Sequence, residues 1–307
     1  MTATDSLFLI TGATGNTGAP TVKALREEGH RVRAFVHTLD ERSDRLKELG
    51  AEIVAGDVHD FAALSAAMAD VRAAYFCYPL PAGRLLDATA VFAEAAIEAG
   101  VEAVVNMSQM VARRDAPSPV SRQHWLAERL LDRTPMMITH LRSTLFLEWV
   151  HWCWQRTESE GVLRTPFAHG RHAPLLGPDH AAVIAAILTK PDLHQGQSYR
   201  LTGPAEVDHR DIAAEVGQSL GIPVRYEPVS VDAFTSALTA AGLPKILIEH
   251  IAAIAQDYHE GFFAGSNNLV EVIGGHRPTT VGQYVASVRD TFDHSGRFAL
   301  PQDRLTA

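Results

Sequence analysis

The stretch that decides the fold is Leu7-Phe8-Leu9-Ile10-Thr11-Gly12-Ala13-Thr14-Gly15-Asn16-Thr17-Gly18, an apolar strand that runs directly into a glycine-rich turn. Gly12 permits a sharp turn off the strand, and Gly15 lets the backbone approach a phosphate with no side chain in the way. Gly18 allows the next helix to pack close to the sheet. Because a helix N-terminus offers free N–H groups to anions, we expect the pyrophosphate of a dinucleotide to bind here.

The residues around this turn support the same interpretation. A helical pattern follows over Thr17–Glu28, and a second apolar strand follows over Val32–Val36. Strand, turn, helix and strand in this order are the context that a dinucleotide-binding turn requires. Within the loop, which includes Thr14, we expect the backbone amides of Asn16 and Thr17 to face the pyrophosphate, with capping of the helix as the alternative role.

Composition excludes several classes of protein. The net charge of −9 over 307 residues argues against a nucleic-acid surface. No apolar run is long enough to span a bilayer, and residues 1–5 do not resemble a signal peptide. Two cysteines, Cys77 and Cys153, are typical of a reduced intracellular protein, so we expect a cytoplasmic location.

The fifteen histidines raise the question of a metal site. His169, His172 and His180 lie close together among Gly and Pro residues, but no carboxylate or cysteine completes a regular ligand set. We therefore expect surface histidines and no metal site.

The first half of the chain alternates between strand and helix patterns. The predicted strands are short apolar runs, as in a parallel sheet covered on both faces: Leu7–Thr11, Val32–Val36, Glu52–Ala55, Ala73–Tyr78, Ala103–Met107 and Met137–Leu141. Helical patterns fill the gaps at Thr17–Glu28, Arg42–Leu49, Phe61–Met68, Leu85–Ala99 and Ser121–Asp132. This order predicts an α/β fold of the Rossmann type, a doubly wound parallel sheet.

The alternation stops after about Arg142, and the rest is mainly helical. The expected helices are Pro178–Leu188, His209–Leu220, Val231–Ala240, Pro244–Tyr258 and Val281–Thr291, with strands at Ser198–Leu201 and Arg225–Pro228. We predict a dinucleotide-binding domain over residues 1–150 and a smaller substrate-binding region over 151–307, with an approximate boundary and some strands returning to the main sheet. Residues 298–307 are expected to form an exposed arm.

Motifs spread along the chain resemble the NmrA-like family, atypical members of the short-chain dehydrogenase/reductase superfamily. They are the glycine loop of residues 11–18, Gly50-Ala51-Glu52, Gly56-Asp57, residues 99–102 leading into Val105-Asn106-Met107-Ser108, His124 with Glu128, Leu141-Arg142 with Phe146, Leu201-Thr202-Gly203-Pro204 and Gly275-His276-Arg277-Pro278-Thr279-Thr280. The resemblance implies either an NAD(P)H-dependent reductase of quinones or dyes, or a redox-sensing regulator without turnover.

One departure from the wider superfamily concerns the chemistry. Ordinary short-chain dehydrogenases need a tyrosine four residues before a lysine, where the tyrosine protonates the carbonyl oxygen. None of the six tyrosines here has a lysine four residues later. By the pattern of the family, His124 takes the place of the tyrosine and Glu128 that of the lysine. Alcohol–ketone chemistry through such a pair is therefore not expected.

The resemblance also suggests which residues hold the cofactor. No acidic residue directly follows Val36, so His37 and Arg42 are expected to favour the 2′-phosphate of NADPH over NADH, although Arg42 also suits a solvated helix face. Asp57, with the Val58 backbone, is expected beside the adenine, or alternatively as the cap of the next helix. Cys77, Tyr78 and Pro79 are expected to border the nicotinamide ribose, since ligands lie beyond the carboxyl ends of such strands.

The catalytic and substrate residues follow from the same pattern. Ser108 stands where the superfamily keeps a serine and is expected to donate to a substrate oxygen, or to bond local backbone. His124 is expected to donate a proton or orient the substrate, with Glu128 one turn on to hold its imidazole or to cap an exposed face. Phe146, Trp149 and Trp152 recur at helical spacing, which suits core packing or, together with Tyr78, an apolar wall for an aromatic substrate.

The favoured hypothesis is a hydride transfer from NAD(P)H to a quinone-like or otherwise conjugated small molecule. A dinucleotide-sensing regulator is the second hypothesis. We expect no nucleic-acid or membrane partner, and a homodimer is the candidate assembly.

Overall fold

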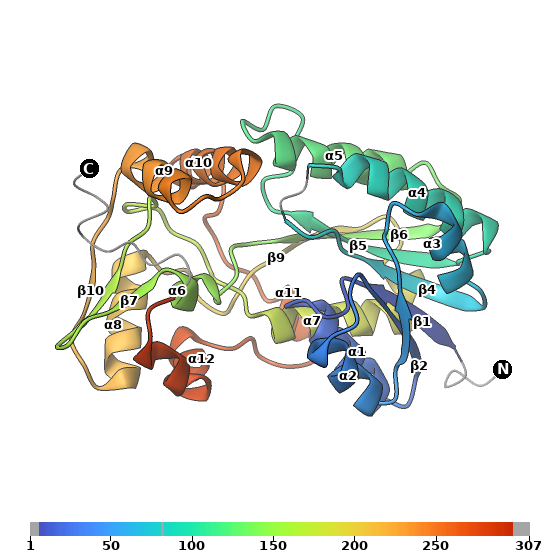
Figure 1. Ribbon diagram of the computed structural model, residues 1–307, viewed down its shortest axis with the longest axis horizontal. Coiled ribbons are helices and arrows are strands. Elements are labelled where there is room, and N and C mark those ends of the chain that lie inside the picture. Colours follow the sequence, from blue (N-terminus) through green and yellow to red (C-terminus); the bar gives the residue numbers. More distant parts are fainter. Residues whose placement is uncertain (1–5, 81–82, 297–307) are drawn as a thin grey trace.

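The larger part of the molecule is built on a seven-stranded parallel sheet, seen in the computed structural model, which describes residues 6–80 and 83–296 (Figure 1). The strand order is β3-β2-β1-β4-β5-β6-β9. The strands are β1 (Leu7–Thr11), β2 (Arg31–Val36), β3 (Glu52–Ala55), β4 (Val71–Phe76), β5 (Ala103–Gln109), β6 (Met137–Ser143) and β9 (Ser198–Leu201). The order reverses between β1 and β4, and in such sheets the crevice at this reversal receives the ligand.

Helices cover both faces of this sheet, which explains why its central strands β1, β4 and β5 are mostly apolar and buried. One face carries α1 (Gly18–Glu27), α2 (Glu41–Glu48), α7 (Gly177–Thr189) and α11 (Leu269–Gly274); the other carries α3 (Phe61–Ala67), α4 (Leu85–Glu98) and α5 (Pro119–Leu131) (Figure 1). Phe8 and Ile10 of β1 belong to the core cluster on the first face, and Leu7 and Leu9 to the cluster on the second. Alternate side chains of one strand therefore fill two separate cores.

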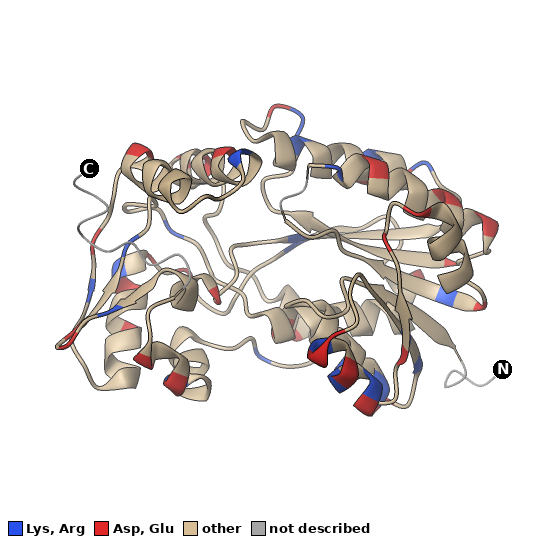
Figure 2. Ribbon diagram, in the orientation of Figure 1, with Lys and Arg blue, Asp and Glu red and all other residues tan. Residues whose placement is uncertain are grey.

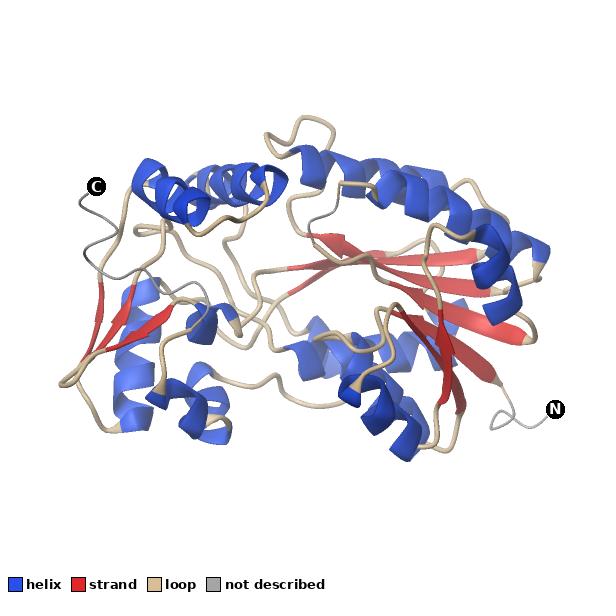
Figure 3. Ribbon diagram, viewed as in Figure 1, coloured by secondary structure: helices blue, strands red, loops and turns tan. Residues whose placement is uncertain are grey.

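A second region packs beyond the carboxyl ends of the main strands. It contains a small sheet of β7 (Trp154–Arg156), β8 (Gly161–Leu163) and β10 (Val224–Tyr226), in the order β10-β8-β7 (Figure 3). Around it lie α6 (Trp149–Trp152), α8 (His209–Leu220), α9 (Val231–Ala240), α10 (Lys245–His259) and α12 (Val281–Ser287), with a 3-10 turn at Arg289–Asp293. A second 3-10 turn, Pro191–Leu193, follows α7 beside the main sheet. Trp154 is the largest fully buried side chain, and it lies in the core of this region.

The two regions interlock along the chain. The predicted division at residue 150 assigns α7, β9 and α11 to the second region, whereas they pack on the main sheet, with β9 paired in parallel to β6. A returning strand was part of that prediction, but the two helices were assigned to the wrong region. Pairing with β6 holds β9 in the main sheet, and burial in the core cluster on the first face holds α7 and α11 there.

The predicted elements differ from the structure mainly in the second half. The expected helix carrying Phe146, Trp149 and Trp152 is wrong: only Trp149–Trp152 is helical, because Phe146 forms a β-bridge with Leu175. The short strands β7 and β8 and helix α11 were not predicted. The expected helix over Val281–Thr291 ends at Ser287, and the expected arm over residues 298–307 lies outside the described residues.

The structure also shows where the charged residues and the histidines lie. Acidic and basic segments are interspersed along α2 and α5 (Figure 2). His169 is exposed, but the expectation of surface histidines is wrong for His172 and His180, which are 3% and 0% exposed. Among residues 6–80 and 83–296, no group of three or more potential ligand side chains is arranged for a metal ion. No helix in this part of the chain has the length and apolar character needed to cross a bilayer.

Candidate functional site

The glycine loop after β1 has the geometry of a phosphate-binding turn. Gly12 has a φ of +58°, a conformation that residues with a Cβ rarely adopt, and the N–H of Gly15 donates to the Gly12 carbonyl at 2.9 Å. A Cβ on Gly18 would lie 2.2 Å from the Gly12 oxygen, so only glycine lets α1 start this close to the turn. The Thr11 hydroxyl accepts the N–H of Cys77 at 2.8 Å, which ties the loop to the end of β4.

The loop fits a pyrophosphate. Within the described residues, the backbone N–H groups of Asn16, Thr17 and Gly18 have no acceptor. A Cβ on Gly15 would meet only the Gly12 oxygen within 4 Å, at 3.1 Å, so the position is open on its outer side. Free amides at the start of a ten-residue helix form an anion site. The alternative of a capping side chain is wrong for Thr17, whose hydroxyl instead bonds the Tyr75 hydroxyl at 2.9 Å.

The ribose end of the predicted cofactor site contains an ion pair. His37 is exposed after β2. Asp40 caps α2, and its carboxylate also contacts the Arg42 guanidinium at 2.6 Å. Hydrogen bonding to Arg42 lowers the pKa of Asp40 and raises that of Arg42. The guanidinium is therefore already paired, and a 2′-phosphate would have to compete with Asp40 for it.

Asp57, which was predicted beside the adenine, and Tyr78, which was predicted beside the nicotinamide ribose, both contact His59. Asp57 accepts from the backbone N–H of His59 at 2.9 Å, and its carboxylate lies 2.8 Å from the His59 Nδ1. The Tyr78 hydroxyl lies 3.4 Å from the other ring nitrogen of His59. Asp57 is not the cap of α3, since Asp60 has that role. Val58 packs partly buried against the core beneath α3, while Pro79 is exposed.

Ser108 and Glu128 meet in the core, together with Arg142, which the sequence placed in a family motif but not in the site. The Ser108 hydroxyl donates to Glu128 Oε1 at 2.6 Å, and Arg142 of β6 donates to both carboxylate oxygens, at 2.8 and 2.5 Å. Both Ser108 and Glu128 are 0% exposed. Because a hydroxyl has one proton, Ser108 donates to a substrate only if it leaves Glu128.

His124 stands apart from this cluster. Glu128 does not hold its imidazole, and the expectation that Glu128 caps an exposed face is also wrong. His124 bonds the Met107 backbone, and its Nδ1 has no partner in the described part of the chain. Burial, with His250 nearby, lowers the pKa of His124 to about 3, so the imidazole is neutral near pH 7.

Glu148 links the phosphate loop to the second region, and sequence reasoning missed it. Glu148 Oε1 accepts the N–H of Gly177, the first residue of α7, at 3.0 Å. A Cβ on Gly177 would lie 2.4 Å from the Asn16 carbonyl oxygen and 2.7 Å from its side-chain amide. Burial raises the pKa of Glu148, while the hydrogen bonds from Gly177 and Asn16 oppose that rise. Arg142 and Glu148 are the only charged residues in the apolar run 141–150, a signal that could have identified both.

A small cavity lies beyond the carboxyl end of β6, and Phe146 and Trp149 both line it. Its volume is about 20 Å³. The polar residues around it are Thr165, His172 and His209, and the rest of its wall is apolar. The predicted aromatic pair therefore meets two histidines that are 3% and 7% exposed.

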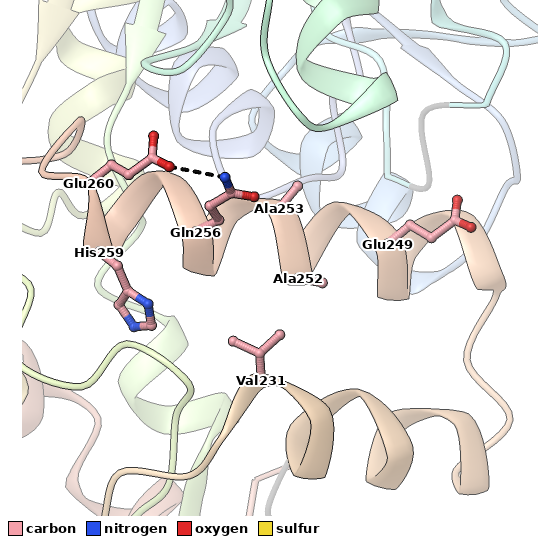
Figure 4. Close-up of a pocket in the computed structure, with 7 residues that line it drawn as sticks. All are labelled: Val231, Glu249, Ala252, Ala253, Gln256, His259 and Glu260. Atoms are coloured by element: carbon pink, nitrogen blue, oxygen red, sulfur yellow. Dashed lines mark hydrogen bonds between the residues drawn. The ribbon is translucent and has the colours of Figure 1, made fainter.

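A larger depression of about 570 Å³ lies between α9 and α10 (Figure 4). Val231, Ala252 and Ala253 are among the residues that line it, and Gln256, also in the lining, donates to Glu260 at 3.0 Å. None of its residues comes from the strand-end loops. It therefore has no part in the site at the end of the main sheet.

The chain is similar to several known proteins along most of its length. The model of the NmrA-like family matches residues 4–284. The NAD(P)H azoreductase of Xenophilus azovorans is 26% identical over 280 residues, which cover 91% of this chain and 96% of that protein. The (4-alkanoyl-5-oxo-2,5-dihydrofuran-3-yl)methyl phosphate reductase of Streptomyces griseus is 32% identical over 244 residues, 78% of this chain and 83% of that protein.

Two further similarities span nearly the whole chain. Quinone oxidoreductase 2 of Escherichia coli is 26% identical over 283 residues, which cover 91% of this chain and 98% of that protein. The structure of NmrA, a negative transcriptional regulator in complex with NAD, superimposes with a TM-score of 0.80 at 16% identity, over 93% of this chain and 95% of that one. The second likeness concerns the fold alone.

Proposed function

The chain belongs to the NmrA-like family and is an oxidoreductase, and we propose that it transfers hydride from NADPH to a quinone-like or otherwise conjugated small molecule. The observation that carries this proposal is the buried set of Ser108, Glu128 and Arg142, in which the serine proton is already bonded to a carboxylate. A site whose serine proton is already bonded suits a substrate that can accept hydride without a proton donor beside it.

Different residues bind the cofactor and orient the substrate. The amides of Asn16, Thr17 and Gly18 hold the pyrophosphate, and Glu148 holds the start of α7 against this loop. The bound nicotinamide supplies the hydride. Phe146 and Trp149 orient the aromatic acceptor beside it, which is catalysis by positioning.

Proton delivery explains the choice of acceptor. Reduction of a simple ketone builds charge on one oxygen and needs a strong donor, as the tyrosine of ordinary relatives supplies. A quinone spreads the charge over its ring, and water or a weak donor completes the reaction. Neutral His124 is such a weak donor once its single N–H turns from the Met107 backbone to the substrate. His124→Ala should slow quinone reduction roughly tenfold to a thousandfold and leave cofactor binding intact.

A preference for NADPH rests on the lack of an acidic residue directly after Val36 and on Arg42. The pairing of Arg42 with Asp40 makes this preference modest, because the phosphate has to displace a carboxylate. His37, exposed beside them, is the second group available to a phosphate.

The second candidate is a regulator that senses the dinucleotide, supported by the fold likeness to NmrA. Measuring NADPH oxidation with a panel of quinones, azo dyes and unactivated ketones separates the two. Turnover of quinones but not ketones supports the reductase. Absence of turnover with unequal affinities for NADPH and NADP supports the regulator, and efficient ketone reduction contradicts the mechanism.

A further inference from the structure

The cavity at the end of β6 carries a donor and an acceptor that the proposed reaction does not yet use. We infer that it binds one oxygen of the substrate between His172 and His209, so that the preferred acceptor carries a second oxygen remote from the one nearest the nicotinamide, as a 1,4-quinone does. This inference rests on the proposed function, since the aromatic wall at the cavity is part of that site.

The size of the cavity sets what can enter it. A volume of about 20 Å³ accommodates roughly one water molecule and excludes an aromatic ring. A carbonyl or hydroxyl oxygen is of this size. The ring that carries it would lie against Phe146 and Trp149, at the carboxyl end of β6 where ligands of such sheets bind.

The two imidazoles are neutral and firmly held. Burial lowers the pKa of His172 well below its usual range and that of His209 to about 4. The rings stack at 5.5 Å with an interplanar angle of 25°. The Tyr258 hydroxyl lies 2.7 Å from His172 Nδ1 and 3.4 Å from His209 Nδ1. A neutral site of this kind favours an uncharged oxygen over a carboxylate or phosphate.

The Tyr258 hydroxyl also decides the tautomers. It has one proton, which goes to the nearer nitrogen, His172 Nδ1, and its oxygen accepts from His209 Nδ1–H. His172 therefore has its proton on Nε2, whereas Nε2 of His209 is an acceptor. Within the described residues neither Nε2 has a hydrogen-bond partner. The pair thus accommodates a carbonyl before reduction and a hydroxyl after it.

Two ligands with the same carbon frame test this inference without turnover. 1,4-Naphthoquinone carries both oxygens and 1-tetralone carries one, and the Kd of each is measured by calorimetry on the complex with NADP. We expect the quinone to bind at least about tenfold more tightly, the factor for one hydrogen bond of roughly 1.4 kcal/mol. Tyr258→Phe should reduce this ratio to below about threefold, because the tautomers are no longer fixed.

Tyr199→Phe is the matched control. Its hydroxyl lies 2.9 Å from His194 Nδ1, and neither residue lines the cavity, so the ratio should stay unchanged. If Tyr258→Phe does not fold, His209→Phe keeps an aromatic ring and should close the same gap. Equal binding of both ligands to the parent, or an unchanged ratio in Tyr258→Phe or His209→Phe, overturns the inference. Quinone turnover by the parent is measured separately, so failure of the proposed function remains distinguishable.

Discussion

His180 is a fully buried histidine whose replacement should stabilise the protein, more strongly in acid. It lies in α7 with its ring 5.9 Å from that of Phe146, and in the described part of the chain neither ring nitrogen has a hydrogen-bond partner. Burial lowers the pKa of His180 to about 3. The folded protein therefore keeps this imidazole neutral, at a cost that grows as the pH falls.

The magnitude follows from the two protonation equilibria. At pH 7.5 the imidazole is neutral in both states. At pH 5 the unfolded chain binds a proton, at an ordinary pKa of about 6.5, and the folded chain does not, which favours unfolding by about 2 kcal/mol. Stability is thus fully present above pH 6.5 and lost as the pH falls towards the folded pKa. His180→Leu removes this loss, and it also removes two unpartnered nitrogens worth roughly 1–3 kcal/mol at either pH.

The assay is urea unfolding of parent and His180→Leu at pH 7.5 and pH 5, followed by tryptophan fluorescence. The advantage of the variant should be about 2 kcal/mol larger at pH 5. Ile184→Val, a non-titrating change in the same helix, is the control and should cost about 1 kcal/mol at both pH values. A His180→Leu advantage that does not change with pH would refute the reasoning, because it would mean that the imidazole titrates alike in both states.

The remaining predictions concern the cofactor site. Gly15→Val should abolish dinucleotide binding in calorimetric titration while the melting temperature stays close to that of the parent, because a side chain there meets little protein but fills the phosphate position; retained affinity would remove the loop from the site. NADPH should bind more tightly than NADH, and Arg42→Ala should reduce the difference between the two affinities. Asp40→Asn should increase that difference, because it frees the Arg42 guanidinium and keeps an oxygen that caps α2. Equal affinities for NADPH and NADH in the parent would contradict this. Gly177→Ala should weaken NADPH binding roughly tenfold, because the new Cβ pushes Asn16 of the phosphate loop. Gly282→Ala is the control and should leave the affinity unchanged, since its Cβ meets only the Ser219 hydroxyl at 3.3 Å. The same NADPH affinity in both variants would show that α7 does not position the loop.

Much of the dinucleotide-binding half could be predicted because its signals are local. The glycine loop is a continuous stretch whose turn, close approach and helix start are each set by missing side chains, as the positive φ of Gly12 confirms. Most strands of the parallel sheet are apolar runs separated by amphipathic helices. The alternation of strand and helix along the chain therefore follows from the pattern alone. The same pattern failed after Phe146, where a bridge to Leu175 interrupts helical spacing.

The pairing of polar side chains was decided only by the tertiary structure. Ser108 and Glu128 were recognised in the sequence, but Arg142, which occupies both oxygens of that carboxylate, comes from another strand. His172 and Tyr258 are 86 positions apart and meet only when α10 packs against the second region. A single sequence shows which groups are available, whereas burial and distance determine which proton goes to which atom. The sequence alone therefore determined the parallel sheet of the first half and the glycine turn, and the packing of distant segments decided the hydrogen-bond partners of Ser108, Glu128 and His172.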